Sequence, residues 1–234
     1  YINEENPDNI CDFLSLASHH YYNSDKELIS DTIYDIIYDS LKKKYPKHKF
    51  FQNIGSDVNE NKVKIPVHMG SQNKIKTLKE LNIWLSKNDN DYYLITPKLD
   101  GSSALVEYNN GKINLYSRGN GKYGKNLNHL IKYLDFPHLD INIQVRGELI
   151  VSKNNFQKFE YEYSSPRNMV NSLTSHKEVD KEKIKYLDFV VFELYDNTQN
   201  LESKLELVEK FGFKTVLNEK VDHYSITMWE SIKS

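Results

Sequence analysis

The chain has 234 residues, which is enough for one large domain or for a medium domain with a small one. Its formal net charge of −2 gives no overall basic field, so a nucleic-acid role would need a local patch or further domains. The single cysteine, Cys11, excludes an internal disulfide and a cysteine-rich zinc site. No apolar run approaches the ~20 residues of a membrane span, and the N-terminus does not resemble a signal peptide. We therefore expect a soluble protein of a reducing compartment, cytosolic or nuclear.

The first sixty residues predict a helical hairpin. Apolar positions from Asn9 to about Tyr22 follow one helical stripe. A second helix is expected to start at Ser30, whose side chain can cap it, and to run to about Tyr45, where Pro46 stops it. Such a hairpin is too small to bury much core by itself.

Tyrosine and aspartate are dense around the turn of this hairpin. One interpretation is a tyrosine-rich helix pair that packs on a neighbour, with an acidic first turn favoured by the helix dipole. The other is a site for a cationic ring, because aromatic faces beside carboxylates attract such ligands. The residues concerned are Tyr21, Tyr22, Asp25, Asp31, Tyr34 and Asp35.

Residues 48–85 predict a connector followed by a short helix. Residues 48–64 are polar and predict a connector with a turn at 55–57. A short helix is expected from Leu78 to Leu85, with Trp84 on its apolar side.

A lysine stands at an unusual place after the aromatic run 92–95. That run ends at Thr96-Pro97 and predicts a strand meeting a loop. Lys98 follows, and its charge is expensive to bury beside a strand unless something compensates it. Asp100, two residues on, projects to the same side of an extended backbone and could compensate it. A surface ion pair and a reactive lysine both remain open from this pattern alone.

The strongest hairpin signal of the chain follows Gly101. Two β-rich runs, 102–108 and 112–117, are separated by an Asn-Gly turn. The second run leads into Arg118 and a literal G-x-G-x-x-G at 119–124. A dinucleotide fingerprint should open a helix inside a β-α-β unit, and this one follows an antiparallel hairpin. We interpret it as a glycine loop that lets Arg118 approach a polar ligand.

The remaining core carries two more polar signals. A strand region over 141–151 contains Glu148, which is expensive to bury unless it accepts hydrogen bonds; an ion pair with Arg146 is the simplest explanation. Residues 165–168 open a helix-like stretch. The nearly continuous apolarity of 187–195 predicts a buried central strand, and 204–211 predicts a helix that Gly212 closes.

Taken in order, these motifs resemble those of covalent nucleotidyltransferases, and the resemblance spans nearly the whole chain. The matching residues are Lys98-Leu99-Asp100-Gly101, Arg118-Gly119-x-Gly121, Arg146-Gly147-Glu148 and the 187–195 strand. The Tyr/Asp hairpin and the later Ser165-Pro166-Arg167-Asn168 are similar to NAD-dependent rather than ATP-dependent DNA ligases. The implied fold is α+β, with antiparallel nucleotidyltransferase (ATP-grasp-like) sheets and flanking helices. It would comprise a small helical nicotinamide mononucleotide (NMN) domain at 1–60 and an adenylation domain at 61–234.

The resemblance implies a lysyl-AMP mechanism. Lys98 would attack the α-phosphate of NAD and release NMN, and AMP would then pass to the 5′-phosphate of nicked DNA. To attack, the amine must be neutral, so desolvation or cationic neighbours should lower its pKa below the ~10.4 of free lysine. Asp100 completes the catalytic motif, and Mg²⁺ would neutralise phosphate charge.

The resemblance also implies roles for the NAD-binding residues. Arg118 and Glu148 would hold the AMP ribose, Phe192 would stack on adenine, and Arg167 would lie near the phosphates. Ser71 and Gln72 match a loop that contacts adenine through its backbone, and Gly101 belongs to the lysine motif. The NMN half would be held by Tyr21, Tyr22, Asp31, Tyr34 and Asp35.

Several positions depart from the family pattern. Thr96 stands where Glu is usual, Asn120 replaces an Asp, Lys125 an expected Glu, and Thr174 lies nearest a missing second Arg. A distal D-G-V-V-I-K strand, a later lysine motif and the DNA-clamping domains have no counterpart in the sequence. We therefore expect a piece of a divergent ligase, with an adenylation domain incomplete at its C-terminus.

The remaining expectations concern source and partners. Composition and divergence favour a large DNA virus as the source. We expect a monomer with no membrane partner, which contacts nicked double-stranded DNA mainly through other domains. An ATP-dependent DNA or RNA ligase and a degenerate nucleotide-binding remnant are the alternatives.

Overall fold

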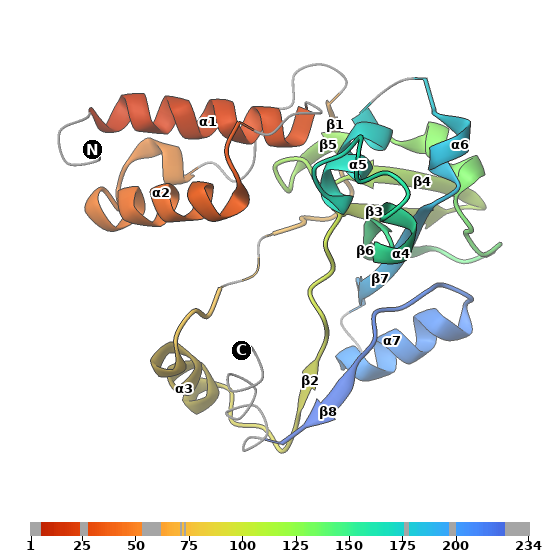
Figure 1. The fold of residues 1–234 in the computed structure, drawn as a ribbon. Coiled ribbons are helices and arrows are strands. Elements are labelled where there is room, and N and C mark those ends of the chain that lie inside the picture. Colours follow the sequence, from red (N-terminus) through yellow and green to blue (C-terminus); the bar gives the residue numbers. More distant parts are fainter. Residues whose placement is uncertain are drawn as a thin grey trace.

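The computed structural model describes residues 6–23, 28–52, 62–70, 72, 74–175, 178–196 and 200–222. Figure 1 shows a helical hairpin beside a sheet domain, with a smaller group of elements below. The helices are α1 (Pro7–Asn23), α2 (Asp31–Lys44), α3 (Leu78–Lys87), α4 (Lys153–Phe156), α5 (Pro166–Ser175), α6 (Lys181–Ile184) and α7 (Leu201–Lys210), with 3-10 turns η1 (Lys49–Gln52) and η2 (Asn128–Tyr133). The strands are β1 (Lys62–Lys64), β2 (Tyr93–Ile95), β3 (Ser102–Asn109), β4 (Lys112–Ser117), β5 (Tyr123–Lys125), β6 (Ile143–Val151), β7 (Leu187–Leu194) and β8 (Glu219–Val221).

A four-stranded antiparallel sheet forms the centre of the molecule. Its strand order is β4-β3-β6-β7. The hairpin between β3 and β4 turns at Asn110 and Gly111, whose φ angles of 50° and 72° fit the twist of the flanking strands. The expected hairpin and the α+β class with antiparallel sheets are confirmed.

The main core lies on one face of this sheet. Alternate residues of the strands point into it, among them Ala104 and Val106 of β3 and Leu149 of β6, all essentially buried. Helix α5 packs on β6, and its Met169 belongs to this core. Because this face is filled by apolar side chains, the polar residues of the strands face the opposite side, where the candidate site forms.

The expected central position of the 187–195 strand is wrong. Strand β7 lies at the end of the sheet order. Its outer edge is nevertheless covered, because the Val191 N–H donates to Lys214 O and the Val216 N–H donates to Val191 O, both at 2.8 Å. Helix α7 also packs on β7. Helix α7 and the segment 214–216 cover β7. Its apolar sequence is therefore explained without a further strand at its outer edge.

The helical hairpin has its own small core around Leu14 and Leu41. Both expected helices are confirmed, and Ser30 caps α2 by accepting a hydrogen bond from the Ile33 N–H. The expectation of a plain connector over 48–64 is wrong: it contains η1 and β1, and β1 pairs with β5. The predicted turn at 55–57 lies outside the described residues.

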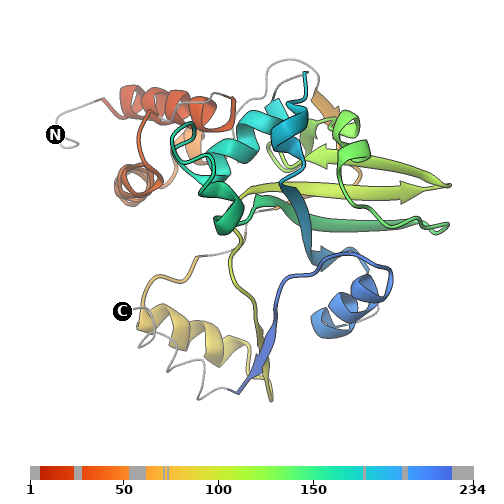
Figure 2. The ribbon, with the colours of Figure 1, turned by 45° about the vertical axis from the view of Figure 1, so that its right-hand side comes forward.

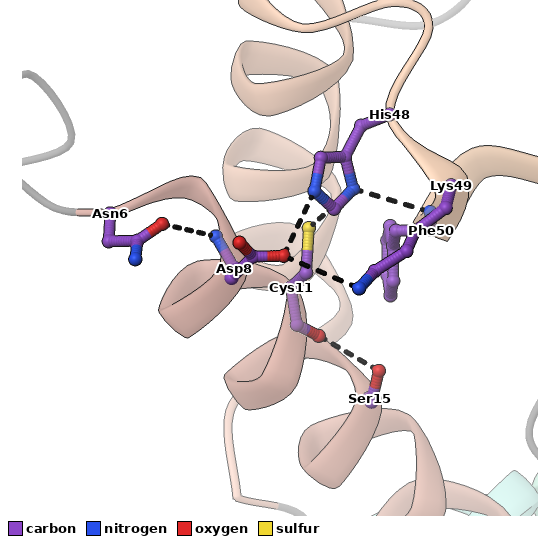
Figure 3. A network of polar contacts seen from close by, with 7 residues as sticks. All are labelled: Asn6, Asp8, Cys11, Ser15, His48, Lys49 and Phe50. Carbon is purple, nitrogen blue, oxygen red and sulfur yellow. Dashed lines mark hydrogen bonds and ion pairs between the residues drawn. The ribbon is translucent and has the colours of Figure 1, made fainter.

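A polar network fixes η1 against α1 (Figure 3). The Cys11 Sγ and the His48 Nδ1 are 3.3 Å apart, and the His48 Nε2 lies 3.3 Å from an Asp8 carboxylate oxygen. The Phe50 N–H donates to the same Nδ1. Burial, with the charges of Asp8 and Asp12, raises the pKa of the Cys11 thiol. The network therefore holds a neutral thiol beside an imidazole acceptor.

A third group of elements, α3 with the β2–β8 pair, lies apart from the central sheet in both ribbon views (Figures 1 and 2). We call it the β2–β8 lobe. Leu85 and Tyr93 are buried in it, whereas Trp84 packs on Tyr93 at 5.7 Å between ring centroids and stays 40% exposed. The predicted α3 helix is confirmed, but its apolar side is only partly covered. In the part of the chain that the structure describes, no helix has the length and apolarity of a membrane span.

Candidate nucleotide-binding site

The loop that carries Lys98 lies directly against β6. A Cβ atom on Gly101 would stand 1.9 Å from the carbonyl oxygen of Leu149, so only glycine fits there. This contact holds the loop against β6, near enough for the charge of Lys98 to act on Glu148. The Lys98 side chain itself is exposed. The expected desolvation of its amine by the protein is therefore not seen in this structure.

Asp100 pairs with an arginine rather than with Lys98. Its carboxylate lies 2.6 Å from an Nη atom of Arg167, in the first turn of α5. The expectation that Asp100 compensates Lys98 directly is corrected by this contact. Burial lowers the pKa of the Arg167 guanidinium. The ion pair places a largely buried cationic group two residues from the lysine.

Glu148 is the acidic centre of the site. Burial raises the pKa of its carboxyl to about 7, against the opposing charges of Lys98, Arg146 and Arg118. The negative charge of Asp100 also raises the pKa of Glu148. These charges act on one carboxyl, so their residues lie near one another. The structure thus brings together the lysine loop at 96–101, the glycine loop at 118–124 and strand β6.

Arg146 does not serve Glu148 as an ion-pair partner. Its Nη1 lies 3.4 Å from the carboxylate of Glu193 on β7, and its Nε donates to the Ser103 hydroxyl on β3 at 3.2 Å. The guanidinium also lies over the ring of Phe192, 5.3 Å from its centroid. The predicted Arg146–Glu148 pair is thus replaced by contacts across both neighbouring strands.

The backbone at 68–70 is held by three side chains. The Tyr195 hydroxyl donates to His68 O at 3.3 Å, Arg118 Nε to Met69 O at 3.2 Å, and Arg146 Nη2 to Gly70 O at 3.2 Å. Three successive carbonyls therefore accept from Arg146 on β6 and from the residues that directly follow β4 and β7. The segment continues directly toward the residues expected to contact adenine.

The glycine loop is confirmed as a loop. Gly119 and Gly121 have φ angles of 51° and 89°, and the chain continues into β5 rather than into a helix. Asn120 Oδ1 accepts from the N–H groups of Lys122 and Tyr123. A carboxylate oxygen could accept the same two bonds, so the change from Asp to Asn preserves the turn.

The structure places the other departures from the family pattern in different surroundings. The Thr174 hydroxyl donates to the carbonyls of Val170 and Asn171 in its own helix, so it does not replace an arginine. Partial burial lowers the pKa of Lys125 on β5. Nothing in the structure explains Thr96.

The expected NMN residues are only partly described. Tyr34 stacks on Tyr38 with 6.1 Å between ring centroids, and Asp35 pairs with Lys74 at 2.9 Å. Tyr21, Tyr22 and Asp31 lie in helices α1 and α2, but their side chains, like residue Ser71, lie outside the described part. Gln72 is exposed.

The sequence did not indicate Ser103 or Tyr195 as residues of the site, and it predicted the wrong partner for Arg146. Ser103 and Tyr195 act through hydrogen bonds to residues far away in the chain, for which the sequence carries no signal. Arg146 stood out as a charge inside an apolar strand, but its partners come from other strands.

Comparison with known proteins agrees with this geometry. Residues 58–229 match the family model described as NAD-dependent DNA ligase adenylation domain. The chain is 36% identical over 237 residues to a DNA ligase of Acanthamoeba polyphaga mimivirus, covering 98% of this chain and 37% of that protein. It is 34% identical over 218 residues to putative DNA ligase 205R of Invertebrate iridescent virus 6, covering 87% and 34%.

A bacterial relative gives the same result. The DNA ligase of Helicobacter pylori strain G27 is 29% identical over 247 residues, with 92% of this chain and 37% of that protein covered. The chain spans a little over a third of the length of these relatives. The family model covers well over half of the chain, and the charges of Lys98, Arg118 and Arg146 act together on Glu148. The chain therefore belongs to the family of NAD-dependent DNA ligase adenylation domains.

Proposed function

We propose that this chain carries out the adenylation step of NAD-dependent DNA ligation. The Lys98 amine attacks the α-phosphate of NAD, so that an N–P bond forms and the bond from that phosphorus to the bridging oxygen breaks. NMN leaves with the electron pair of that bond, and the amine gives up a proton. AMP is then passed to the 5′-phosphate of nicked DNA. The supporting observation is the Arg167–Asp100 ion pair, which places a guanidinium beside the lysine loop.

The AMP half of the substrate would lie on the polar face of the sheet. We assign the ribose to Arg118 and Glu148, and adenine stacking to Phe192. Ser71 and Gln72 would contact the adenine through their backbone. Arg167 would meet the phosphates, since a guanidinium pairs well with phosphate oxygens. Its present partner, Asp100, is exposed enough to share it.

The NMN half would be held by the helical hairpin, which we assign to an N-terminal domain over 1–60. Tyr34 and Asp35 supply an aromatic face and a carboxylate for a cationic nicotinamide ring. Tyr21, Tyr22 and Asp31 would complete that site. The adenylation domain would occupy 61–234.

Mg²⁺ is the cofactor that we propose beside NAD. In nucleotide sites it is held by one or two carboxylates together with phosphate oxygens and water. Among the described residues no group of three or more His, Cys, Asp or Glu side chains could hold a metal, so the phosphates would supply most ligands. Asp100 is the exposed carboxylate next to Lys98 that fits this role. When bound, the ion neutralises phosphate charge during the transfer.

Intact-protein mass spectrometry after incubation with NAD and Mg²⁺ tests the proposal. We expect an AMP adduct on the wild-type protein that maps to Lys98, and none on Lys98→Arg, which keeps the charge but is a poor nucleophile. Lys112→Arg, at the exposed start of β4, is the matched control and should form the adduct normally.

Two results would reject the proposal. One is an adduct that forms from ATP but not from NAD; the other is an adduct that persists in Lys98→Arg. Sealing of a fluorescent nicked duplex then tests the later step, and its dependence on Lys98 should match that of the adduct.

A further inference from the structure

Arg146 has contacts that the lysyl-AMP mechanism does not use. It is 9% exposed, in the middle of β6. Its three nitrogens reach three separate elements: Ser103 on β3, Glu193 on β7 and the carbonyl oxygen of Gly70. A buried guanidinium with every nitrogen engaged is held in one orientation, because each contact restricts the planar group further.

The same guanidinium contacts the expected adenine platform. It lies 5.3 Å from the ring centroid of Phe192, within the range of a cation–π contact. Phe192 is partly exposed on the polar side of β7. The guanidinium therefore joins the aromatic ring to the backbone at Gly70, which precedes the residues expected to contact the adenine edge.

Two other donors act on the same backbone. Arg118 and Tyr195 donate to the carbonyls of Met69 and His68, immediately before Gly70. Burial raises the pKa of Tyr195, so its hydroxyl remains a donor at neutral pH. Met69 is fully buried, and its N–H donates to Gly121 O. The segment is therefore fixed in place before any nucleotide arrives.

We infer that Arg146 is a positioning residue for the adenine half of NAD, which holds the Phe192 ring and the 68–70 backbone in one arrangement. The inference rests on the proposed function, because it concerns how the same nucleotide is bound. Arg146 contacts no reacting atom in the proposed mechanism. Its loss should weaken nucleotide binding and leave the chemical step at Lys98 nearly unchanged.

Single-turnover transfer of AMP to Lys98, followed at varied NAD concentration, measures both the half-saturating NAD concentration and the maximal rate of the chemical step. For Arg146→Met we expect the half-saturating NAD concentration to rise roughly 10- to 100-fold, since hydrogen bonds of a charged group are lost. The maximal rate should change less than about threefold, because binding and chemistry are separate terms. Arg146→Lys should recover part of the affinity, and competition by free NMN should stay as in the wild type.

Lys214→Met is the matched control. It removes an ion pair with Asp188 on β7, the strand that also carries Phe192 and Glu193, outside the set of contacts described above. Its half-saturating concentration should equal that of the wild type. If Arg146→Met does not fold, judged by urea unfolding, Tyr195→Phe takes its place: it deletes one hydroxyl, and we expect a smaller rise in the same quantity.

The outcomes separate the inference from the proposed function. An unchanged half-saturating concentration in the folded variants, or a fall in maximal rate alone, overturns the positioning role while lysyl-AMP formation stands. Absence of the adduct from the wild-type protein overturns the proposed function, and the inference falls with it.

Discussion

At the scale of single residues, the site depends on charges that a strand would normally exclude. Glu148 has a carboxyl whose pKa is raised to about 7 by burial, even though the charges of Lys98, Arg146 and Arg118 oppose the shift. Desolvation therefore exceeds the attraction of three cations. A hydrogen-bond donor beside this partly exposed carboxyl would stabilise its ionised form.

The raised pKa of Glu148 predicts a loss of stability as the pH rises. Below about 4.5 the carboxyl is protonated in both states; between there and about 7 the unfolded chain ionises first, so the folded state is penalised progressively. The full penalty is up to about 3 kcal/mol, at 1.36 kcal/mol per pKa unit. Urea unfolding of wild type and Glu148→Gln at pH 4.5 and 8 should show the variant gaining that much relative stability at the higher pH. Equal pH dependence in the two proteins would contradict this.

At the scale of elements, close backbone contacts decide where the loops lie. The lysine loop can approach β6 because Gly101 has no side chain. Gly147 plays a similar part in β6, where an added Cβ would stand 2.5 Å from Val190 O. The site therefore depends on glycines within its motifs as much as on the charged residues beside them.

Gly101→Ala should destabilise the fold by about 3 kcal/mol, because its new Cβ would overlap the backbone oxygen of Leu149 and the loop must move away. Urea unfolding monitored by fluorescence gives the measurement. Gly70→Ala is the matched control: the nearest atom to its Cβ would be a His68 ring nitrogen at 3.4 Å, an ordinary contact, and the expected loss is below about 1 kcal/mol. A Gly101→Ala protein as stable as the wild type would show that the contact is not tight.

The network on α1 makes a prediction about thiol chemistry. Cys11 is 4% exposed and its thiol pKa is raised, so little thiolate is present or accessible at pH 7.5. Reaction with a chromogenic disulfide reagent should be slower by at least about 100-fold in the native protein than in 8 M urea, where ordinary cysteine reactivity returns. His48→Ala, which removes the imidazole over the sulfur, should react faster than the wild type in the native state. Comparable native and denatured rates would mean that the hairpin opens readily.

The sequence predicted the local features of this fold well. The Ser30 cap, the Asn110-Gly111 turn and the α7 helix closed at Gly212 each depend on a few adjacent residues, and the structure confirms them. The α+β class and the family followed from motif order. The assigned NAD contacts stay predictions.

Long-range contacts could not be predicted in the same way. The pairing of Arg146 with Glu193, and of Asp100 with Arg167, depends on which strands and helices become neighbours. The edge position of β7 was missed for the same reason: a strand covered by a helix and a returning chain has the apolar pattern of a central one. The exposure of Lys98 likewise depends on what packs around its loop.

At the scale of the whole molecule, burial is distributed unevenly. The central sheet holds most of the buried side chains, whereas the β2–β8 lobe buries Leu85 and Tyr93 and leaves Leu78, Ile83 and Trp84 at least 40% exposed. Contacts also cross from the hairpin to the segment before α3, where Lys74 and Lys76 pair with carboxylates of α2. These exposed pairs contribute little stability individually.

Hydrogen exchange should reveal this unevenness. Backbone amides in β2 and β8 are expected to exchange at least about 100-fold faster than those in β3 and β6, because local opening of the lobe exposes little apolar surface. Exchange measured by mass spectrometry on peptides over 93–95 and 104–108 checks this. Equal protection of the two regions would indicate that the lobe unfolds only with the central sheet.

The three side chains that bind the 68–70 backbone have a consequence for how this region tolerates mutation. They bind main-chain oxygens, which every amino acid provides, so these three hydrogen bonds do not depend on the side chains at 68–70. The His68 ring adds a contact of its own, with its Nδ1 3.0 Å from Gly121 O. Loss of one of the distant donors would then release this backbone, whereas a substitution at Gly70 would leave its path unchanged. The positions that follow this segment could then be varied while the backbone at 68–70 stays in place.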